Sequence, residues 1–420
     1  MVFNRMVSWF QQYGSWVLLG PAFLIGLGRG FVIPILPILA RDDFQIGAAS
    51  ATILFAAISF GTMISTIPTG YLADKIGRRK VLIAGPFIMA LSCIGVFLAE
   101  SYWVMLIYLM INGMALQMWM LGRLAAIADT STTRERGRLI TGMSGMQRTG
   151  LLLGPFIGGL VGTYFELRVP FLLYAVAGLM SSIIMFMYIR ESAPGLIKQT
   201  KEEQDAQPAE PEPKLSRREL LTPAVMVFFA AQYLSSLARG GVSGHAGPAF
   251  VFAAYAYGVT AAGLGTISLL VGMIGVPITF MTGQIMDRFG RKRAFVPASV
   301  VLGIAIFLFA LAAAFSLPFW VFVFAYTLGN VAMAFMAGTM QTISSDIAPA
   351  NARGKFLGMS RLTAAAGELS TPGVFAGSMA LLVLPFGYVA GFGLIGAAAF
   401  CSSLIIGRWF AETLSPSKRT

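Results

Sequence analysis

Charged side chains inside apolar stretches are the part of this sequence most able to do chemistry. Five arginines and one glutamate occur there: Arg29, Arg123, Arg148, Arg239, Arg361 and Glu368. A guanidinium placed in a bilayer costs at least about 2.5 kcal/mol, so such residues normally face a cavity and mark a path for polar solutes. Guanidinium groups bind carboxylates, phosphates and sulfonates through paired hydrogen bonds. The pattern therefore predicts recognition of an organic anion.

Arg29 and Arg239 hold equivalent positions, because each lies mid-way along an apolar stretch and is followed by glycine. We expect the two guanidiniums to face each other across a cavity and to bind the anion. Arg148 and Arg361 are further candidates for the same site. The alternative is that Arg29 and Arg239 satisfy nearby carbonyls, or pair with Glu368, and serve the structure alone.

Two residues are candidates for handling protons. Glu368 lies one turn before Pro372, and a carboxylate in apolar surroundings can hold a proton near neutral pH. A permanent ion pair with Arg361, two turns away on the same helical face, is the alternative. His245 is the only histidine, and imidazole titrates near neutral pH. It can equally be a filler in its glycine-rich segment.

Uncharged polar residues in the apolar stretches could line the same cavity. They are Gln117, Gln147, Gln232, Asn330 and Gln341. Trp119 and Phe335 could supply apolar walls, although packing is the usual role of an aromatic residue in such a stretch. No Gly-x4-Gly-Lys-Ser/Thr phosphate loop occurs, and Cys93 and Cys401 lie alone. We therefore expect no cofactor, no metal site and no enzyme.

The composition indicates an integral membrane protein. Only 11% of the 420 residues are charged and 57% are hydrophobic, whereas a soluble domain carries about 25% charged residues. A span needs about 20 apolar residues. Twelve spans are predicted: 15–40, 46–72, 80–99, 103–128, 139–163, 168–190, 222–252, 260–286, 294–314, 317–345, 355–383 and 385–410. The expected fold is all-α, with a bundle at 1–191, a solvated linker at 192–221 and a bundle at 222–420.

The basic residues orient these spans. With both termini in the cytoplasm, 23 of the 30 lysines and arginines fall in cytoplasmic segments and only Arg41 and Arg168 fall outside. This bias follows the positive-inside rule. The net charge of +12 is therefore mostly a matter of topology, and nucleic acid is not an expected partner.

An internal repeat divides the chain into two similar halves. The loop Gly70-Tyr71-Leu72-Ala73-Asp74-Lys75-Ile76-Gly77-Arg78-Arg79-Lys80 is matched by Gly283-Gln284-Ile285-Met286-Asp287-Arg288-Phe289-Gly290-Arg291-Lys292-Arg293. Further positions align at nearly the same offset, including Asp129 with Asp346. A duplication of this kind predicts two six-helix bundles related by an axis along the membrane normal, with a central cavity between them.

These motifs resemble the major facilitator superfamily over essentially the whole chain. The loop at 70–80 is similar to its signature between spans two and three, and the loop at 129–138 to the one between spans four and five. In span five, Gly150, Gly154, Pro155, Gly158 and Gly159 resemble the motif of its antiporter branches. Many drug–proton antiporters also carry an arginine four residues before a glycine in span four. Here that glycine is Gly113, and Leu109 takes the position of the arginine.

The resemblance implies gates on the cytoplasmic side, made of charge pairs that break when the two bundles rock. The gate candidates are Gly70, Asp74, Gly77, Arg78, Asp129, Arg136, Asp287, Arg291 and Asp346. Asp129 is a plausible partner for Arg78 or for Arg123, which could also line the cavity. The Gly-Pro motif of span five is expected to bend its helix and to allow close contact with a partner helix.

The first expectation for function is proton-coupled export, by alternating access, of a small organic solute that is anionic or amphipathic. An uptake symporter or exchanger for organic anions, or an exporter of a lipid-like substrate, is the alternative. A sensor or scaffold that moves nothing is the least favoured. The expected setting is the inner (plasma) membrane of a bacterium or archaeon, with a monomer as the default.

Overall fold

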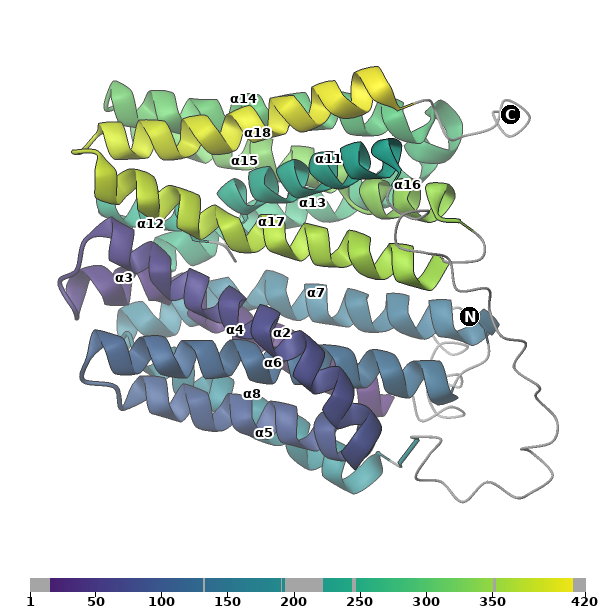
Figure 1. The fold of residues 1–420 in the computed structure, drawn as a ribbon. Helices are drawn as coiled ribbons and strands as arrows, with labels where there is room; N and C mark the ends of the chain where they lie inside the picture. Colours follow the sequence, from purple (N-terminus) through teal and green to yellow (C-terminus); the bar gives the residue numbers. More distant parts are fainter. Residues whose placement is uncertain are drawn as a thin grey trace, which may run out of the picture. The chain divides into compact units, whose positions relative to one another are not determined.

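The computed structural model describes residues 16–130, 133–189, 191–192, 222–243, 247–349 and 353–410. Within these ranges the regular secondary structure is helical (Figure 1). The helices are α2 (Trp16–Val32), α3 (Ile35–Asp42), α4 (Ala48–Ile76), α5 (Arg78–Phe97), α6 (Tyr102–Thr130), α7 (Thr133–Tyr164), α8 (Val169–Tyr188), α11 (Pro223–Val242), α12 (Pro248–Ala256), α13 (Ala261–Phe289), α14 (Arg291–Ala314), α15 (Phe319–Met336), α16 (Thr339–Ile347), α17 (Arg353–Leu381) and α18 (Phe386–Trp409).

The chain forms two compact units. The first takes its described residues from Met1–Phe44, Ala57–Pro208 and Thr260–Leu269, and the second from Gln45–Ala56, Ala209–Val259 and Leu270–Thr420. Each unit thus carries a short segment from the other half of the sequence. The predicted linker at 192–221 lies almost entirely outside the described residues, and the predicted division at 1–191 and 222–420 stays a prediction.

In the first unit, α2 packs against α7 and α8, and α5 packs against α6 and α8. Glycines bring α2 and α7 together, because a Cβ on Gly30 would lie 2.7 Å from the Cα of Gly154. Small residues allow such close approach of membrane helices, where van der Waals packing replaces the hydrophobic effect. The glycines of the predicted span-five motif therefore allow the close packing of α2 and α7.

The second unit repeats this plan with other side chains. α14 packs against α15 and α18, and α11 packs against α17 and α18. Side chains bond across the α11–α17 interface, where the Thr371 hydroxyl donates to the Leu237 carbonyl at 2.9 Å. The Tyr233 hydroxyl likewise donates to Ser370 at 2.8 Å. These contacts fix which face of α17 is covered by α11.

Three predicted spans are each divided into two helices. The span at 15–40 breaks between α2 and α3 at Ile33–Pro34, where proline lacks the N–H that a continuous helix needs. The span at 222–252 becomes α11 and α12, and the span at 317–345 becomes α15 and α16. Hydropathy predicts how long an apolar stretch is, and it does not register a break inside one.

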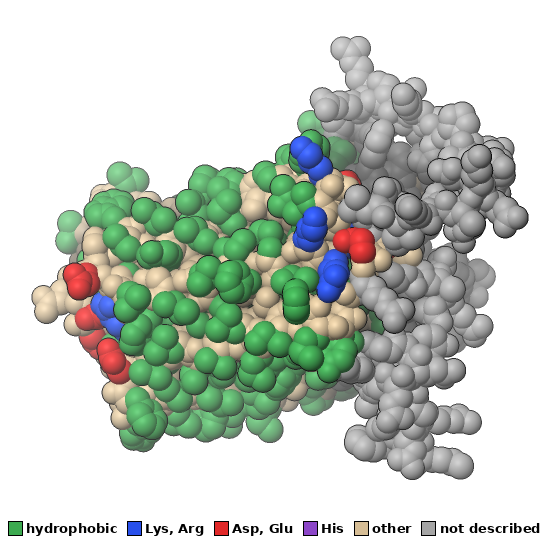
Figure 2. All heavy atoms as spheres, turned by 90° about the horizontal axis from the view of Figure 1, so that it is seen from below, with side chains coloured by type: hydrophobic (Ala, Val, Ile, Leu, Met, Phe, Trp, Pro, Cys, Tyr) green, Lys and Arg blue, Asp and Glu red, His purple; other side chains and the backbone are tan. Residues whose placement is uncertain are grey.

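The helices suit a bilayer. In the described residues, nine helical stretches are long and apolar enough to cross a membrane. The remaining predicted spans fall on α7, on α11 with α12, and on α17, which carry more small and polar residues. Figure 2 shows one face on which hydrophobic side chains cover the middle and charged side chains gather toward the ends. On α5 and α8, Leu91 and Ile183 are among the exposed apolar residues.

Candidate functional site: a pocket at a helix break

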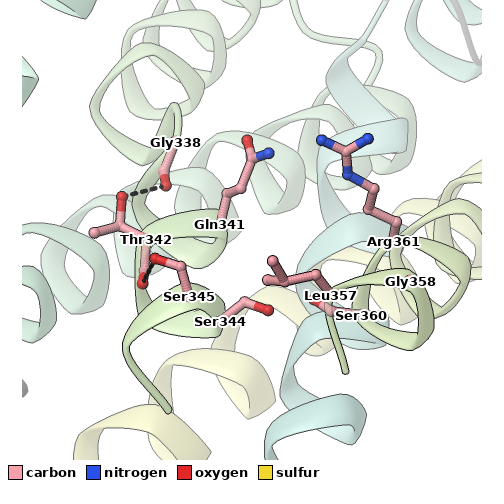
Figure 3. Close-up of a pocket in the computed structure, with 9 residues that line it drawn as sticks. All are labelled: Gly338, Gln341, Thr342, Ser344, Ser345, Leu357, Gly358, Ser360 and Arg361. Carbon is pink, nitrogen blue, oxygen red and sulfur yellow. Dashed lines mark hydrogen bonds between the residues drawn. The ribbon is translucent and has the colours of Figure 1, made fainter. Parts of the chain in front are cut away.

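A pocket of about 540 Å³ lies beside the break between α15 and α16 and is closed on its other side by α17. Figure 3 shows its lining residues. They are Gly338, Gln341, Thr342, Ser344, Ser345, Leu357, Gly358, Ser360 and Arg361. Two of the predicted solute-binding residues, Gln341 and Arg361, therefore line the same pocket. This volume is within the range of about 300–1,000 Å³ that small-molecule sites occupy.

Gly338 makes the break possible. α15 ends at Met336, and the chain passes through Ala337 to Gly338, whose φ of 77° lies in the left-handed region. Glycine adopts this conformation without the steric cost that a Cβ would bring. α16 then begins at Thr339, and the Thr342 hydroxyl donates to the Gly338 carbonyl at 3.0 Å. The first turn of α16 thus forms one wall of the pocket.

The polar groups of the pocket suit an anion. Figure 3 shows the amide of Gln341 and the guanidinium of Arg361 extending toward the same space. Both residues are exposed, and Arg361 has no hydrogen-bond or ion-pair partner among the described residues. The hydroxyl oxygen of Ser344 is buried without a partner in that same part of the chain. None of the nine lining residues is acidic. The pocket therefore offers donors and one positive charge.

Glu368 lies farther along α17 and is exposed, contrary to the expectation that it is buried in apolar surroundings. The alternative of a permanent ion pair with Arg361 is also wrong for the described structure, since none of the pairs found joins the two. The physical reason is that α11 covers the neighbouring face of α17, through residues such as Gly367 and Thr371, and leaves the face of Glu368 open. The role of Glu368 in proton coupling stays a prediction.

Arg29 and Arg239 are each half-buried. Arg29 lies on α2 of the first unit and Arg239 on α11 of the second, so the expectation that they face each other stays a prediction. Arg239 donates to the Ser236 hydroxyl at 3.1 Å, and its Nε is buried without a partner among the described residues. Gln232, two turns earlier on α11, is 7% exposed and its Oε1 also lacks a described partner.

The remaining predicted polar residues are dispersed. Arg148 is exposed on α7 beside the half-buried Gln147. On α15, Asn330 donates to the carbonyl of Tyr326 in its own helix at 2.8 Å. Gln117 on α6 donates to the hydroxyl of Thr66 at 3.0 Å. None of these residues lines the α16–α17 pocket.

Arg123 departs from the sequence prediction. We expected it to pair with Asp129 or to line a cavity, but it is only 5% exposed and its guanidinium carbon lies 5.9 Å from the ring centroid of Trp119. Its Nη1 is buried without a partner in the described part of the chain. Trp119 is fully buried, so it packs in the core of the first unit rather than forming a cavity wall.

The predicted gate loop of the first half contains an ion-pair cluster. Arg78 binds Asp129 at the end of α6, at an Nε–Oδ2 distance of 3.1 Å, and also Asp74, one turn back on α4. Gly77 alone connects α4 to α5, with a φ of 103°. This glycine makes a tight turn between the two helices. Gly70 lies within α4 with open space around its Cβ position, so it makes no close contact with another helix in the described residues.

Glu191 is a residue of this cluster that the sequence analysis missed. Its carboxylate accepts hydrogen bonds from the backbone N–H groups of Arg78 at 2.8 Å and Arg79 at 3.3 Å. A negative charge at the start of α5 interacts favourably with the helix dipole and with its unpaired N–H groups. The available signal was a lone acidic residue directly after the sixth predicted span.

The second half repeats the ion pair. Arg291 binds Asp346 at an Nε–Oδ2 distance of 2.9 Å, and Gly290 makes the one-residue turn before α14 with a φ of 101°. Of the other gate candidates, Asp287 and Arg136 lie on described helices, but their side chains are outside the described part. His245 lies outside the described residues altogether. The gating role of both loops stays a prediction.

The Gly-Pro motif of α7 serves close packing. A Cβ on Gly154 would lie 2.5 Å from the Leu27 carbonyl oxygen, and Gly150 and Gly158 press equally closely on α2. Gly159 points instead to the start of α13, next to the carbonyl of Ala261. Pro155 lies within α7. The expected close contact with a partner helix is therefore present.

Comparison with known proteins identifies the family of this chain. The sequence matches the Major Facilitator Superfamily over residues 18–372 and again over 233–420. It is 29% identical over 216 residues to quinolone resistance protein NorA of Staphylococcus aureus strain MRSA252, covering 51% of this chain and 54% of that protein. It is 23% identical over 278 residues to multidrug resistance protein 2 of Bacillus subtilis, covering 66% and 68%. The chain spans about half the length of the NorA relatives that it matches.

Solved structures agree on the fold. A D-xylose–proton symporter superposes with a TM-score of 0.75 at 18% identity, covering 96% of this chain and 99% of that one. A peptide transporter crystallised with sulfate gives a TM-score of 0.73 at 14% identity, covering 94% and 93%. At these identities the likeness concerns the fold alone. Together with the family match, it shows that this chain belongs to the Major Facilitator Superfamily and is an integral membrane transporter, not an enzyme.

Proposed function

We propose that this transporter exports a small amphipathic organic anion in exchange for protons, and that the anion binds in the α16–α17 pocket. One observation carries the proposal. Arg361 and Gln341, both predicted from sequence to bind the solute, line one pocket with no carboxylate among its described lining residues. A cation-binding pocket would be expected to contain an acidic residue.

Binding would follow the chemistry of the lining. The guanidinium of Arg361 can donate two parallel hydrogen bonds to a carboxylate, sulfonate or phosphate. The amide of Gln341 and the hydroxyl of Ser344 can complete the donor set. Leu357 provides an apolar contact for the rest of the molecule. An amphipathic anion satisfies both parts of this lining.

Export is the direction that we favour. NorA and multidrug resistance protein 2 are both named for resistance, which fits removal of compounds from the cell. We place the protein in a bacterial plasma membrane, as the relatives above are bacterial, and we take a monomer as the default. Both termini are placed in the cytoplasm because basic residues concentrate in the predicted cytoplasmic loops. Uptake of an anion is an outcome that the transport measurement below separates from this proposal. Export of a lipid-like molecule is the alternative for the substrate.

Proton coupling is assigned to Glu368. Glu368 is the one carboxylate placed deep within a predicted span, and this placement is the reason for the proposal. The ion pairs Arg78–Asp129 and Arg291–Asp346 would open and close the cytoplasmic side during the cycle. Replacement of Glu368 by Gln is expected to leave anion binding in place and to remove the dependence of transport on the proton gradient.

The test compares three amphiphiles with the same eight-carbon chain: octanesulfonate, octyltrimethylammonium and octanol. A ligand that binds only the folded protein raises its apparent stability, by about 2.7 kcal/mol at a hundred times its dissociation constant. We expect octanesulfonate alone to stabilise the purified protein, and Arg361→Gln to abolish the effect. Arg293→Gln, an exposed arginine of the same unit outside the pocket, is the matched control.

Transport of octanesulfonate is then followed in proteoliposomes with an imposed pH gradient. A sulfonate remains ionised, so it does not cross the lipid unaided in a neutral form. Export predicts movement opposite to the flow of protons. Stabilisation by octyltrimethylammonium in place of octanesulfonate would overturn the anion assignment. Movement of the sulfonate in the same direction as protons would overturn antiport in favour of uptake.

A further inference from the structure

α17 carries two opposite charges on one exposed face. Arg361 and Glu368 are both exposed, and so is Ala365 between them. Seven residues of α-helix advance about 10.5 Å along the axis and return to within about 20° of the same direction. The two charged groups therefore share a face about two turns apart, and they form no ion pair with each other.

Neither charge has a structural use in the described residues. No hydrogen bond or ion pair is found there for Arg361 or for Glu368. The contacts of α17 with α11 lie on the neighbouring face of the helix, at Gly367 and Thr371. Charged residues within membrane spans almost always face a protein interior or a water-filled space, because exposure to lipid is costly. Two unpaired charges on one face of a span therefore indicate a surface that meets a charged ligand.

The space between the two charges is suited to an apolar linker. Ala365 is the small residue at the middle of this face, and Ala364 and Ala366 flank it in the sequence. A bulkier side chain at position 365 would stand between the two charged groups. With alanine there, a chain of methylene groups can lie along the helix surface from one charge to the other. At the Arg361 end, the α16–α17 pocket adds its hydroxyl and amide donors.

We infer that this face recognises a zwitterionic solute, whose anionic group binds at Arg361 and whose cationic group, about 10 Å away, binds at Glu368. This inference rests on the proposed function, because it uses the same pocket for the anionic end. The inference adds a cationic group on the solute and the distance between its two charges. A solute with both charges is expected to bind more tightly than an otherwise equal anion, because each group meets an opposite charge that is otherwise unpaired.

The experiment uses ω-aminooctanesulfonate, whose extended chain separates its two charges by about 10 Å. Its comparators are octanesulfonate, which lacks the cation, octylammonium, which lacks the anion, and taurine, whose two charges are too close to span the face. Binding to the purified full-length protein is measured by calorimetry. An exposed ion pair contributes up to about a fivefold gain in affinity, so ω-aminooctanesulfonate should bind about fivefold more tightly than octanesulfonate. Taurine should show no such gain.

Three variants test whether Arg361 and Glu368 cause the higher affinity for ω-aminooctanesulfonate. Glu368→Gln should remove the advantage of ω-aminooctanesulfonate and leave octanesulfonate binding unchanged. Arg361→Gln should weaken both. The exchange variant, with Arg361→Glu and Glu368→Arg together, should retain the preference for the zwitterion in the reversed orientation. Retention in the exchange variant also shows that substitution at these two positions is compatible with the fold.

The outcomes separate this inference from the proposed function. If octanesulfonate and ω-aminooctanesulfonate bind equally well and both depend on Arg361, the anion pocket stands and the zwitterion site is refuted. If neither compound binds, both proposals fail. An unchanged advantage of the zwitterion in Glu368→Gln would likewise refute the role of that carboxylate.

Discussion

The interface of α2 and α7 allows a sharp test of how this fold is held together. In the variant Gly154→Ala, the new Cβ would lie 2.5 Å from the Leu27 carbonyl oxygen and 2.6 Å from the Cα of Gly30. Ordinary contacts begin near 3.4 Å, so the two helices must separate by about 0.9 Å at this point. A gap of that size forfeits about a quarter to a half of the local dispersion energy. Overpacking of this kind typically costs about 1–3 kcal/mol.

The matched control is Gly145→Ala on the same helix, where a Cβ would meet nothing within 4 Å. Alanine in place of an exposed helical glycine favours the helix by about 0.5–1 kcal/mol. The purified variants are heated in detergent and the loss of helical circular dichroism is followed. We expect a lower apparent midpoint for Gly154→Ala and an equal or higher midpoint for Gly145→Ala. Equal midpoints for the two variants would refute the packing argument.

Three further predictions concern the charge clusters and the helix break. Asp129→Asn should leave Arg78 with a weaker set of partners. A double-mutant cycle of unfolding free energies between the two positions should give a coupling of about 1 kcal/mol. A coupling near zero would contradict the ion pair. Glu191→Gln should weaken the capping of α5 by about 1 kcal/mol and speed hydrogen exchange at the Arg78 amide, and unchanged exchange would argue against the cap. Gly338→Ala places a Cβ on a residue with a φ of 77°, which costs about 1–2 kcal/mol, so it should lower stability and octanesulfonate binding. Gly373→Ala, on α17 outside the pocket and without positive φ, should do neither.

Local patterns in the sequence predicted local structure well. The motif at 70–80 and its repeat at 283–293 indicated two equivalent loops, and each loop is a turn of one residue, Gly77 or Gly290. The partner proposed for Arg78 is its partner in the structure. These predictions succeed because a turn or a short-range charge pair depends on a few neighbouring residues. The membrane spans were found for a similar reason, since length and hydropathy are properties of a single segment.

The pocket could be predicted only in part. Gln341 and Arg361 were candidates from sequence, but the break at Gly338 that brings α16 beside α17 was not foreseen. A polar run from Thr339 to Ser345 inside a predicted span was the signal that could have indicated it. Whether such a run breaks a helix depends on which partners its backbone finds. The exposure of Glu368 likewise depends on which face of α17 meets α11, and that is a tertiary property.

The break at Gly338 also means that the two halves of this duplicated chain have specialised. The repeat aligns Gly338 with Leu121, which lies within the uninterrupted helix α6, and Arg361 with Ser144. In the described residues the turns and ion pairs therefore recur in both halves, while the break at Gly338 occurs in the second half. A gene made of two first halves would be expected to encode the scaffold of a transporter without this pocket.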